Sequence, residues 1–113
     1  MTGAERRQHE RFELVVQVTL RRDEASETLT VINISAGGVL LRNDRNVEVS
    51  VGGTIHVQFE VTELGASFAI EAQVIRVVAA TTKPGLLAAM WTSSDAAANA
   101  ALSELLWNLS KRR

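Results

Sequence analysis

The chain contains no cysteine and only two histidines among its 113 residues. Without thiols it cannot form disulfides or a thiolate zinc site, and two histidines are a poor ligand set for a metal. The absence of cysteine also fits a reducing compartment. We therefore expect a cytoplasmic protein that holds no metal and needs no cofactor.

Long hydrophobic runs and a dominant charge are also missing. No apolar stretch approaches the roughly 18 residues that a membrane helix needs, and the polar segment 1–10 does not have the pattern of a signal peptide. The formal net charge is −1, so the bulk positive charge typical of DNA- and RNA-binding proteins is absent. We expect a soluble protein without membrane insertion or DNA and RNA binding, in which any anion site is local.

Motifs for catalysis are missing as well. The sequence has no Walker-type Gly-Lys-Ser/Thr and no dinucleotide-binding fingerprint between a strand and a helix. His56 falls on the polar face of a predicted strand, and the spacing places no nucleophile or carboxylate pair beside it. A solvent-facing histidine is favoured there over a general base. We predict that the chain is not an enzyme and has no catalytic residues.

What the sequence does contain is a series of short alternating segments. Apolar and polar side chains exchange with period two, which predicts half-buried strands. The predicted strands are residues 13–21, 27–33, 38–42, 55–61, 68–76 and 86–91. In the second strand we expect Leu29, Val31 and Asn33 to share a face, and the apolar last strand is expected to be buried on both faces.

The C-terminal segment has helical spacing instead. Ser93, Ser94 and Asp95 suit a helix start, and an apolar stripe follows at Ala97, Ala101, Leu102, Leu105, Leu106 and Leu109. One domain of this length, with short strands and one helix, predicts a mainly β fold. We expect a six-stranded antiparallel β-barrel, because closure removes exposed strand edges, with the C-terminal helix covering it.

The first candidate binding motif is Arg7-x-x-x-Arg11, which precedes the first strand. If this segment turns, the spacing puts both guanidinium groups on one side. Two such groups suit a phosphate, and either can hydrogen-bond a guanine. Alone, the motif fits a solvated charged arm better.

The second motif is Asn33-x-Ser35-x-x-Gly38, between two predicted strands. It offers an amide for a base edge, a hydroxyl for a base or a phosphate, and a glycine that permits a sharp turn or close ligand approach. Alone, this motif also fits a tight turn between strands.

Together and in this order, the two motifs resemble the signature of the PilZ domain family, RxxxR followed by (D/N)xSxxG. The resemblance covers residues 5–109, nearly the whole chain. It is supported by residues 71–76 and by the aromatic Trp91 at the end of an apolar strand. The family fold is a six-stranded antiparallel β-barrel with a C-terminal helix, as the periodicity also predicts.

The resemblance implies a bacterial receptor for cyclic di-GMP, a second messenger with two guanines and two phosphodiesters. By motif position, Arg7 and Arg11 would grip phosphate and guanine, and Asn33, Ser35 and Gly38 would form the surface of the barrel that reads a guanine. Two departures from the family stand out. Asn33 occupies a position that is more often Asp, and Ala88-Ala89 occurs where the family often has a glycine.

The resemblance also implies that two parts of one domain have different roles. Residues 1–12 would be a flexible arm that changes conformation on binding, and residues 13–113 the barrel with its helix. Arg6 and Gly37 are further candidates for ligand binding, and arginine at position 6 resembles members that bind a stacked ligand pair. We expect signalling through an unidentified effector protein, because no output domain is fused to this sequence, and a ligand-dependent homodimer is a further candidate.

Three side chains have open interpretations. Arg76 falls on the inward register of its strand, so either the strand bulges there, or the arginine lies at the barrel mouth near the ligand. A carboxylate partner would explain it equally well. Trp91 is expected in the core rather than against a base, and Trp107 marks either a protein contact or a packed helix edge.

Two other functions remain as alternatives. One is a PilZ-like protein–protein interaction module, related to motility or pili, that does not bind cyclic di-GMP. The other is a small barrel for single-stranded nucleic acid, which would need surface aromatics and a basic groove. The aromatic content of 4% and the net charge of −1 disfavour it.

Overall fold

The structure is a computed structural model that describes residues 10–14, 16–22, 25–43, 47–78 and 85–111. The described residues form seven strands, one 3-10 turn at Thr62–Leu64 and one α-helix. The strands are β1 (Phe12–Glu13), β2 (Gln17–Arg22), β3 (Ala25–Ile34), β4 (Gly38–Arg42), β5 (Thr54–Val61), β6 (Ala66–Val78) and β7 (Leu86–Trp91). The helix α1 is Ala96–Lys111.

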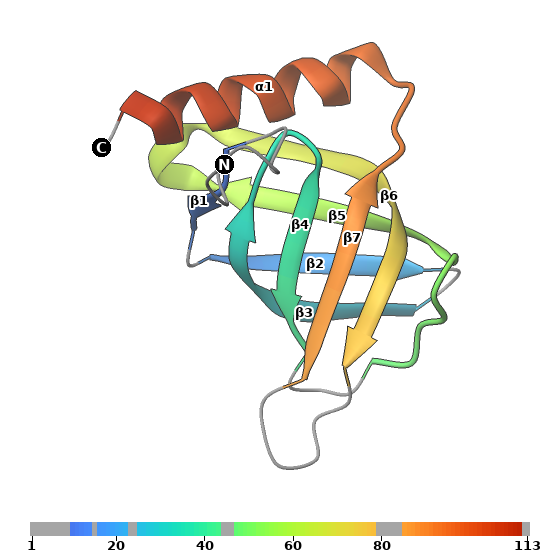
Figure 1. The fold of residues 1–113 in the computed structure, drawn as a ribbon. Helices are drawn as coiled ribbons and strands as arrows, with labels where there is room; N and C mark the ends of the chain where they lie inside the picture. Colours follow the sequence, from blue (N-terminus) through green and yellow to red (C-terminus); the bar gives the residue numbers. More distant parts are fainter. Residues whose placement is uncertain (1–9, 15, 23–24, 44–46, 79–84, 112–113) are drawn as a thin grey trace, which may run out of the picture.

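Six of the strands close into an antiparallel barrel (Figure 1). The order around the barrel is β3-β2-β5-β6-β7-β4, and the pairing of β3 with β4 completes the ring. The short β1 is an additional strand, paired with the end of β3. The predicted fold class, a six-stranded antiparallel β-barrel with a C-terminal helix, is therefore confirmed.

The first predicted strand is interrupted. Residues 13–21 were expected to form one strand, but β1 ends at Glu13 and β2 begins at Gln17. Between them, the backbone N–H of Val16 donates to the carbonyl of Leu14 at 3.1 Å. Both β1 and β2 still pair with β3, so the interruption does not change which strand this segment lies beside.

The barrel interior is filled by apolar side chains from all six strands. Examples that are at most 1% exposed are Leu20, Val31, Leu41, Val57, Phe59, Ile70 and Leu87. Phe59 stacks on Phe68 with ring centroids 4.9 Å apart. Because the inside is packed with side chains, a ligand can reach only the outer surface or a barrel end.

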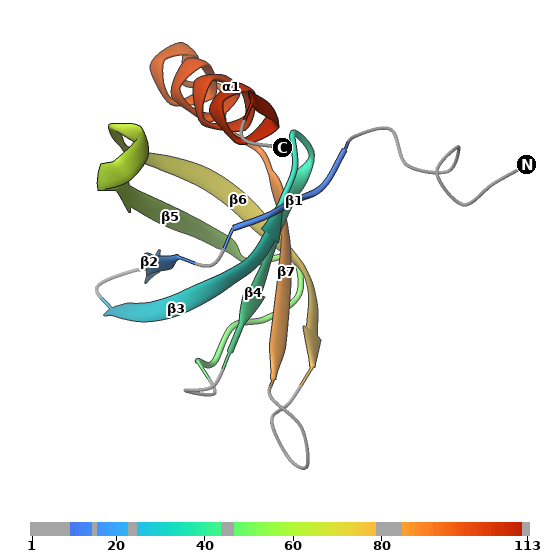
Figure 2. The ribbon, with the colours of Figure 1, turned by 90° about the vertical axis from the view of Figure 1, so that its left-hand side faces the viewer.

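Helix α1 lies across one end of the barrel (Figures 1 and 2). Asp95 caps its start, accepting a hydrogen bond from the backbone N–H of Ala97 at 2.9 Å. The helix buries Ala98, Leu102, Leu105 and Leu109. The predicted helix is confirmed, but its buried stripe begins at Ala98, because Ala97 is exposed. No helix in the described part of the chain is both long and apolar enough to cross a membrane.

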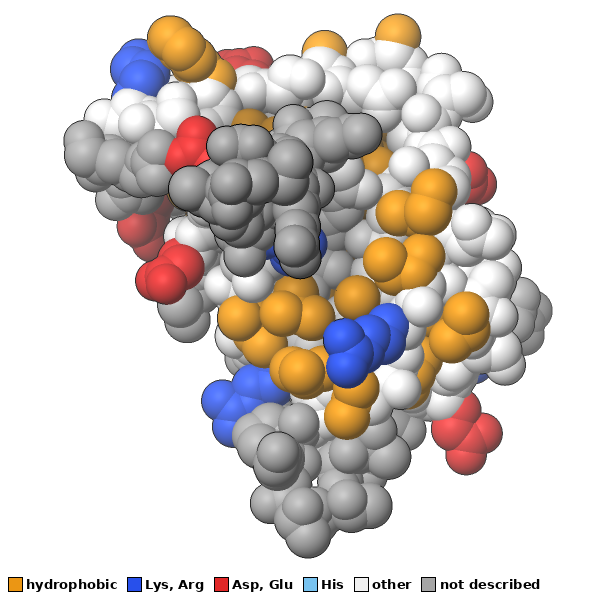
Figure 3. Space-filling view, viewed as in Figure 1, with side chains coloured by type: hydrophobic (Ala, Val, Ile, Leu, Met, Phe, Trp, Pro, Cys, Tyr) orange, Lys and Arg blue, Asp and Glu red, His pale blue; other side chains and the backbone are white. Residues whose placement is uncertain are grey.

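The strand β7 corrects one prediction. It was expected to be buried on both faces, yet only Leu87 and Ala89 point into the core, and Met90 is 43% exposed. The reason is that β7 forms the wall of a barrel, and α1 covers an end rather than this wall. Figure 3 shows the result, a group of apolar side chains with basic ones among them on the face of β4 and β7.

Candidate ligand-binding site

A bulge in β3 turns Asn33 to the outside of the barrel. The pairing with β4 shifts between Val31, opposite Leu41, and Asn33, opposite Leu40. Val31 and Ile34 are both buried, at 1% and 0% exposure. Strict alternation would put residues three positions apart on opposite faces, so the alternation is broken between them. The prediction that Asn33 shares a face with Val31 is wrong, because a bulge inserts one extra residue and reverses the faces that follow.

Asn33 meets Arg11 on this outer surface. The Nη1 of Arg11 donates to the Oδ1 of Asn33 at 3.2 Å, across 22 residues of sequence. The pairing of Glu13 with Asn33 brings the two segments together. Since a guanidinium only donates, the amide oxygen must face it, which leaves the amide N–H groups of Asn33 for another partner. The two sequence motifs therefore meet in space.

Ser35 shapes the loop that follows. Its Oγ accepts hydrogen bonds from the backbone N–H groups of Gly37 at 3.1 Å and Gly38 at 3.2 Å. The backbone N–H of Ser35 donates to the carbonyl of Gly38 at 2.9 Å, and the residue is 8% exposed. The hydroxyl oxygen is thus engaged within the loop, and these bonds do not use its one proton.

Gly38 is required for close approach of β4 to β7. A Cβ on Gly38 would lie 2.2 Å from the carbonyl oxygen of Ala89, and Gly38 pairs with Met90. The sequence suggested a sharp turn or close approach of a ligand. The structure gives a different reason for a glycine here, since the atoms that leave no room for a side chain belong to the backbone of β7.

Trp91 fastens the same loop from β7. Its indole Nε1–H donates to the carbonyl of Ser35 at 2.9 Å, and its backbone N–H donates to the carbonyl of Gly37 at 3.1 Å. The ring meets the buried Phe59 edge-on, with centroids 6.2 Å apart. Sequence reasoning placed Trp91 in the core but missed these bonds, because nothing local relates residues 56 positions apart.

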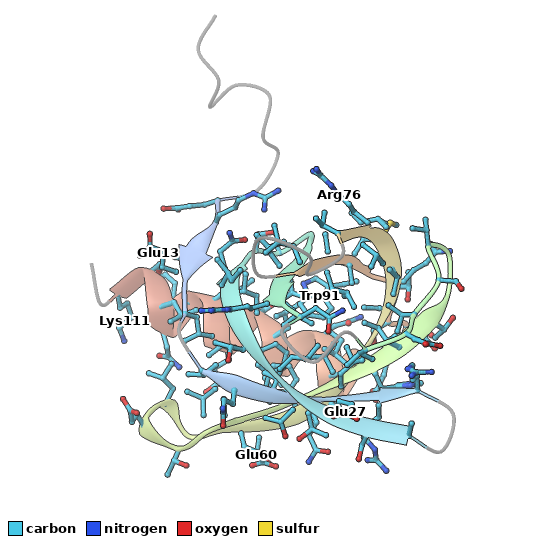
Figure 4. All side chains as sticks on the ribbon, turned by 90° about the horizontal axis from the view of Figure 1, so that it is seen from below. Glu13, Glu27, Glu60, Arg76, Trp91 and Lys111 are labelled. Carbon is cyan, nitrogen blue, oxygen red and sulfur yellow. The ribbon has the colours of Figure 1, made fainter. Side chains whose placement is uncertain are left out.

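Arg76 lies on the outer surface at the far side of the site. The pairing of β6 with β7 shifts between Val74, opposite Ala89, and Arg76, opposite Ala88. The bulge interpretation of Arg76 is therefore confirmed. The bulged residue, Ile75, is 50% exposed, and Arg76 points away from the barrel (Figure 4).

Register places Asn33 and Arg76 at opposite ends of one row across the barrel wall. The row runs Asn33, Leu40, Ala88, Arg76, one residue from each of β3, β4, β7 and β6. Strands are about 4.8 Å apart, so the ends of the row are separated by about 14 Å. A polar end, an apolar middle and a cationic end thus form one open surface.

Two of the predicted ligand-binding residues, Arg6 and Arg7, lie outside the described residues. Within the described ranges, no three His, Cys, Asp or Glu residues are grouped to hold a metal ion.

A hollow of about 410 Å³ is lined by Arg22, Asn43, Val47, Glu48, Val49, Ser50, Val77 and Val78. It contains none of the motif residues, so the candidate site is an open surface rather than that hollow.

Comparison with known proteins gives a consistent family assignment. Residues 5–106 match the family described as PilZ domain. The inhibitor of motility MotI/DgrA of Bacillus subtilis is similar in structure, with a TM-score of 0.70 and 23% identity. That similarity covers 95% of this chain and 53% of the Bacillus chain, so this chain spans about half the length of that protein.

Two single-domain structures match over most of their own length. The PilZ domain of CeSA from a cellulose-synthesizing bacterium has a TM-score of 0.71 at 16% identity, covering 89% of this chain and 98% of that one. The PilZ domain of Escherichia coli YcgR, determined with c-di-GMP, has a TM-score of 0.68 at 15% identity, covering 95% and 93%. No curated protein is similar enough in sequence to count as a match.

Proposed function

Because the chain belongs to the PilZ domain family, we propose that it is a receptor for cyclic di-GMP, which binds on the outer surface around Arg11 and Asn33. The observation that carries the proposal is the hydrogen bond between these two residues. It unites the two halves of the family signature in one place, although they are far apart in the sequence. The YcgR domain whose structure contains c-di-GMP shares this fold.

The chemistry of the surface suits this ligand. Cyclic di-GMP carries about two negative charges, and each guanine presents O6 and N7, which a guanidinium matches in a bidentate manner. Arg11 is exposed and can reach a phosphate or a guanine. The free N–H groups of Asn33 suit an acceptor such as O6, a role that a carboxylate at this position could not fill. Arg7, by its place in the motif, would supply the second guanidinium.

We further propose how binding becomes a signal. The segment with Arg6 and Arg7 would change conformation on ligand binding, and the changed surface would engage an effector protein in the cytoplasm. Such an arm converts a small charged ligand into a new protein surface without catalysis. Binding of a second ligand, aided by Arg6, would favour a homodimer.

The decisive test is isothermal titration calorimetry of the purified protein with cyclic di-GMP. We expect saturable binding at micromolar or lower Kd, with a ligand-to-protein ratio near two if Arg6 supports a stacked pair. Absence of heat, together with an unchanged Tm, would reject the proposal in favour of an interaction module that does not bind the nucleotide.

Ser35→Ala should reduce affinity less than loss of Arg7 or Arg11. The substitution removes the oxygen that holds the N–H groups of Gly37 and Gly38, so the loop loses two hydrogen bonds but no charge. We expect roughly three- to tenfold weaker binding, in line with neutral hydrogen bonds of about 0.5–1.5 kcal/mol. Ser35→Thr keeps the hydroxyl and serves as the control. Equal affinities for the alanine variant and the wild type would show that the loop does not depend on this oxygen.

Arg76→Ala tests how far the ligand extends across the barrel wall. Arg76 lies about 14 Å from Asn33 along the row of paired residues, so it would meet the part of the ligand distant from Arg11. We expect roughly threefold to tenfold weaker binding and an unchanged Tm, because the side chain is exposed. Glu60→Ala, another exposed charge on the neighbouring β5, should leave the affinity unchanged. If the two variants bind equally well, the ligand does not reach β6.

A further inference from the structure

We infer that Trp91 is a positioning residue for the ligand-binding loop, acting through its indole N–H rather than by contact with the ligand. The inference rests on the proposed function and deepens it. Its starting point is the 2.9 Å hydrogen bond from Nε1 of Trp91 to the carbonyl oxygen of Ser35. Ser35 is the central residue of the loop motif, two positions from Asn33.

Trp91 holds the loop at two points. The side chain binds the carbonyl of Ser35, and the backbone N–H binds the carbonyl of Gly37. These two carbonyls therefore face β7, while the N–H groups of Gly37 and Gly38 face the Oγ of Ser35. With both sets of bonds in place, the peptide units between Ser35 and Gly38 have little freedom to rotate.

The anchor itself is rigid. The Trp91 ring packs edge-on against Phe59 at an interplanar angle of 61°. Phe59 is 0% exposed and stacks on Phe68 at 19°. The backbone just beyond the ring is also tied, because the N–H of Thr92 donates to the carbonyl of Glu71 at 3.1 Å. The indole N–H is thus fixed relative to the barrel core and transmits that position to the loop.

The consequence concerns affinity as well as stability. Asn33 is paired with β4 on one side and with β1 on the other, and its direction at the surface depends on the chain that leaves it toward Ser35. If the Ser35 carbonyl loses its donor, that peptide unit is free to turn toward water. Preorganisation is then lost, and part of the binding free energy is spent on ordering the loop.

The test is Trp91→Phe, which keeps an aromatic ring against Phe59 but cannot donate a hydrogen bond. The matched control is Trp107→Phe, the same exchange at a site that is 63% exposed on α1. Titrated with cyclic di-GMP, Trp91→Phe should bind roughly three- to tenfold more weakly, the effect of one lost hydrogen bond. Trp107→Phe should bind like the wild type.

A second readout does not require the Trp91→Phe variant to fold. In the Trp107→Phe protein, Trp91 is the single tryptophan, because the chain has two. Its emission and its indole ¹H–¹⁵N resonance should change on saturation with cyclic di-GMP, since the loop that accepts its hydrogen bond contacts the ligand. A tryptophan whose surroundings are not coupled to the ligand-binding loop would show neither change.

The outcomes separate the inference from the proposed function. If Trp107→Phe binds and neither the affinity of Trp91→Phe nor the Trp91 resonance changes, the positioning role is overturned while the receptor function stands. If the wild-type protein does not bind cyclic di-GMP, the proposed function is overturned and the positioning role falls with it. Weaker binding by Trp91→Phe together with a ligand-dependent indole resonance supports both.

Discussion

Replacing Arg11 with alanine should weaken binding of cyclic di-GMP at least tenfold without unfolding the barrel. Arg11 lies at the surface and donates to Asn33. A hydrogen bond between a charged group and a ligand contributes about 1.5–3 kcal/mol, and each 1.4 kcal/mol is tenfold in affinity. The side chain packs into no core, so far-ultraviolet circular dichroism and the Tm should stay near the wild-type values. Arg7→Ala is expected to have an effect of similar size.

Two further variants show what the arginine supplies. Arg11→Lys retains the positive charge but loses the planar pair of donors, so its affinity should fall between those of the wild type and Arg11→Ala. Arg21→Ala removes an exposed arginine from β2, where it pairs with Ser26 at the opposite end of β3 from Asn33. Its affinity should equal that of the wild type, and raised salt should weaken wild-type binding more than binding by Arg11→Ala. Wild-type affinity in both the Arg7 and the Arg11 alanine variants would remove the arginine motif from the site.

The barrel could be predicted from the sequence because alternation is a local property of a strand. In Thr54–Val61, for example, Ile55, Val57 and Phe59 point inward. The order of apolar and polar residues is enough to predict which of its side chains face the core. The buried face of the helix can be predicted in the same way, from apolar residues three and four positions apart. The resemblance of the two motifs to the family signature singled out Asn33 and Arg11 before the structure showed that they meet.

The orientation of the site could not be predicted in the same way, because a bulge is a property of two strands rather than one. Asn33 and Arg76 both fall on the inward register when faces are counted along the chain. Each follows a bulged isoleucine, Ile32 or Ile75, and each therefore lies outside the barrel. A polar residue on an otherwise apolar face was the available signal, since an unpaired amide or guanidinium is costly to bury.

The physical benefit of these bulges is that they bring polar groups onto an otherwise apolar wall. Without them, strict alternation would put Asn33 and Arg76 inside and leave Leu40 and Ala88 without polar neighbours in the row. With them, the row has an apolar middle between two polar ends. For the proposed ligand, the middle would face the bases, and the ends would face the base edges and the phosphates. Bulges are frequent beside binding sites for this reason, since they re-aim a side chain without changing the rest of the strand.

Gly38→Ala should destabilise the ligand-free protein strongly, with a loss of roughly 1–3 kcal/mol and a Tm lower by about 5–15 °C. The new methyl group would lie 2.2 Å from the carbonyl oxygen of Ala89. That neighbour is backbone, so relief requires β4 and β7 to move apart at a paired position. Thermal denaturation followed by circular dichroism measures the effect directly. Gly65→Ala is the matched comparison for affinity rather than for stability: a Cβ there meets no atom within 4 Å, but the strain of φ 64° also costs about 1–2 kcal/mol.

The Gly38 variant also decides why the binding motif ends in glycine. If the glycine were needed only so that a ligand can approach, Gly38→Ala would melt like the wild type and lose affinity alone. If it is needed for the contact between β4 and β7, stability falls before any ligand is added. Affinity then falls as well, because the displaced strand carries the loop away from Trp91 and Arg11. Gly65→Ala lies in the turn between the 3-10 segment and β6, so it should bind cyclic di-GMP with unchanged affinity despite its own loss of stability. A difference in affinity between the two variants would therefore reflect the geometry of the loop rather than lowered stability in general.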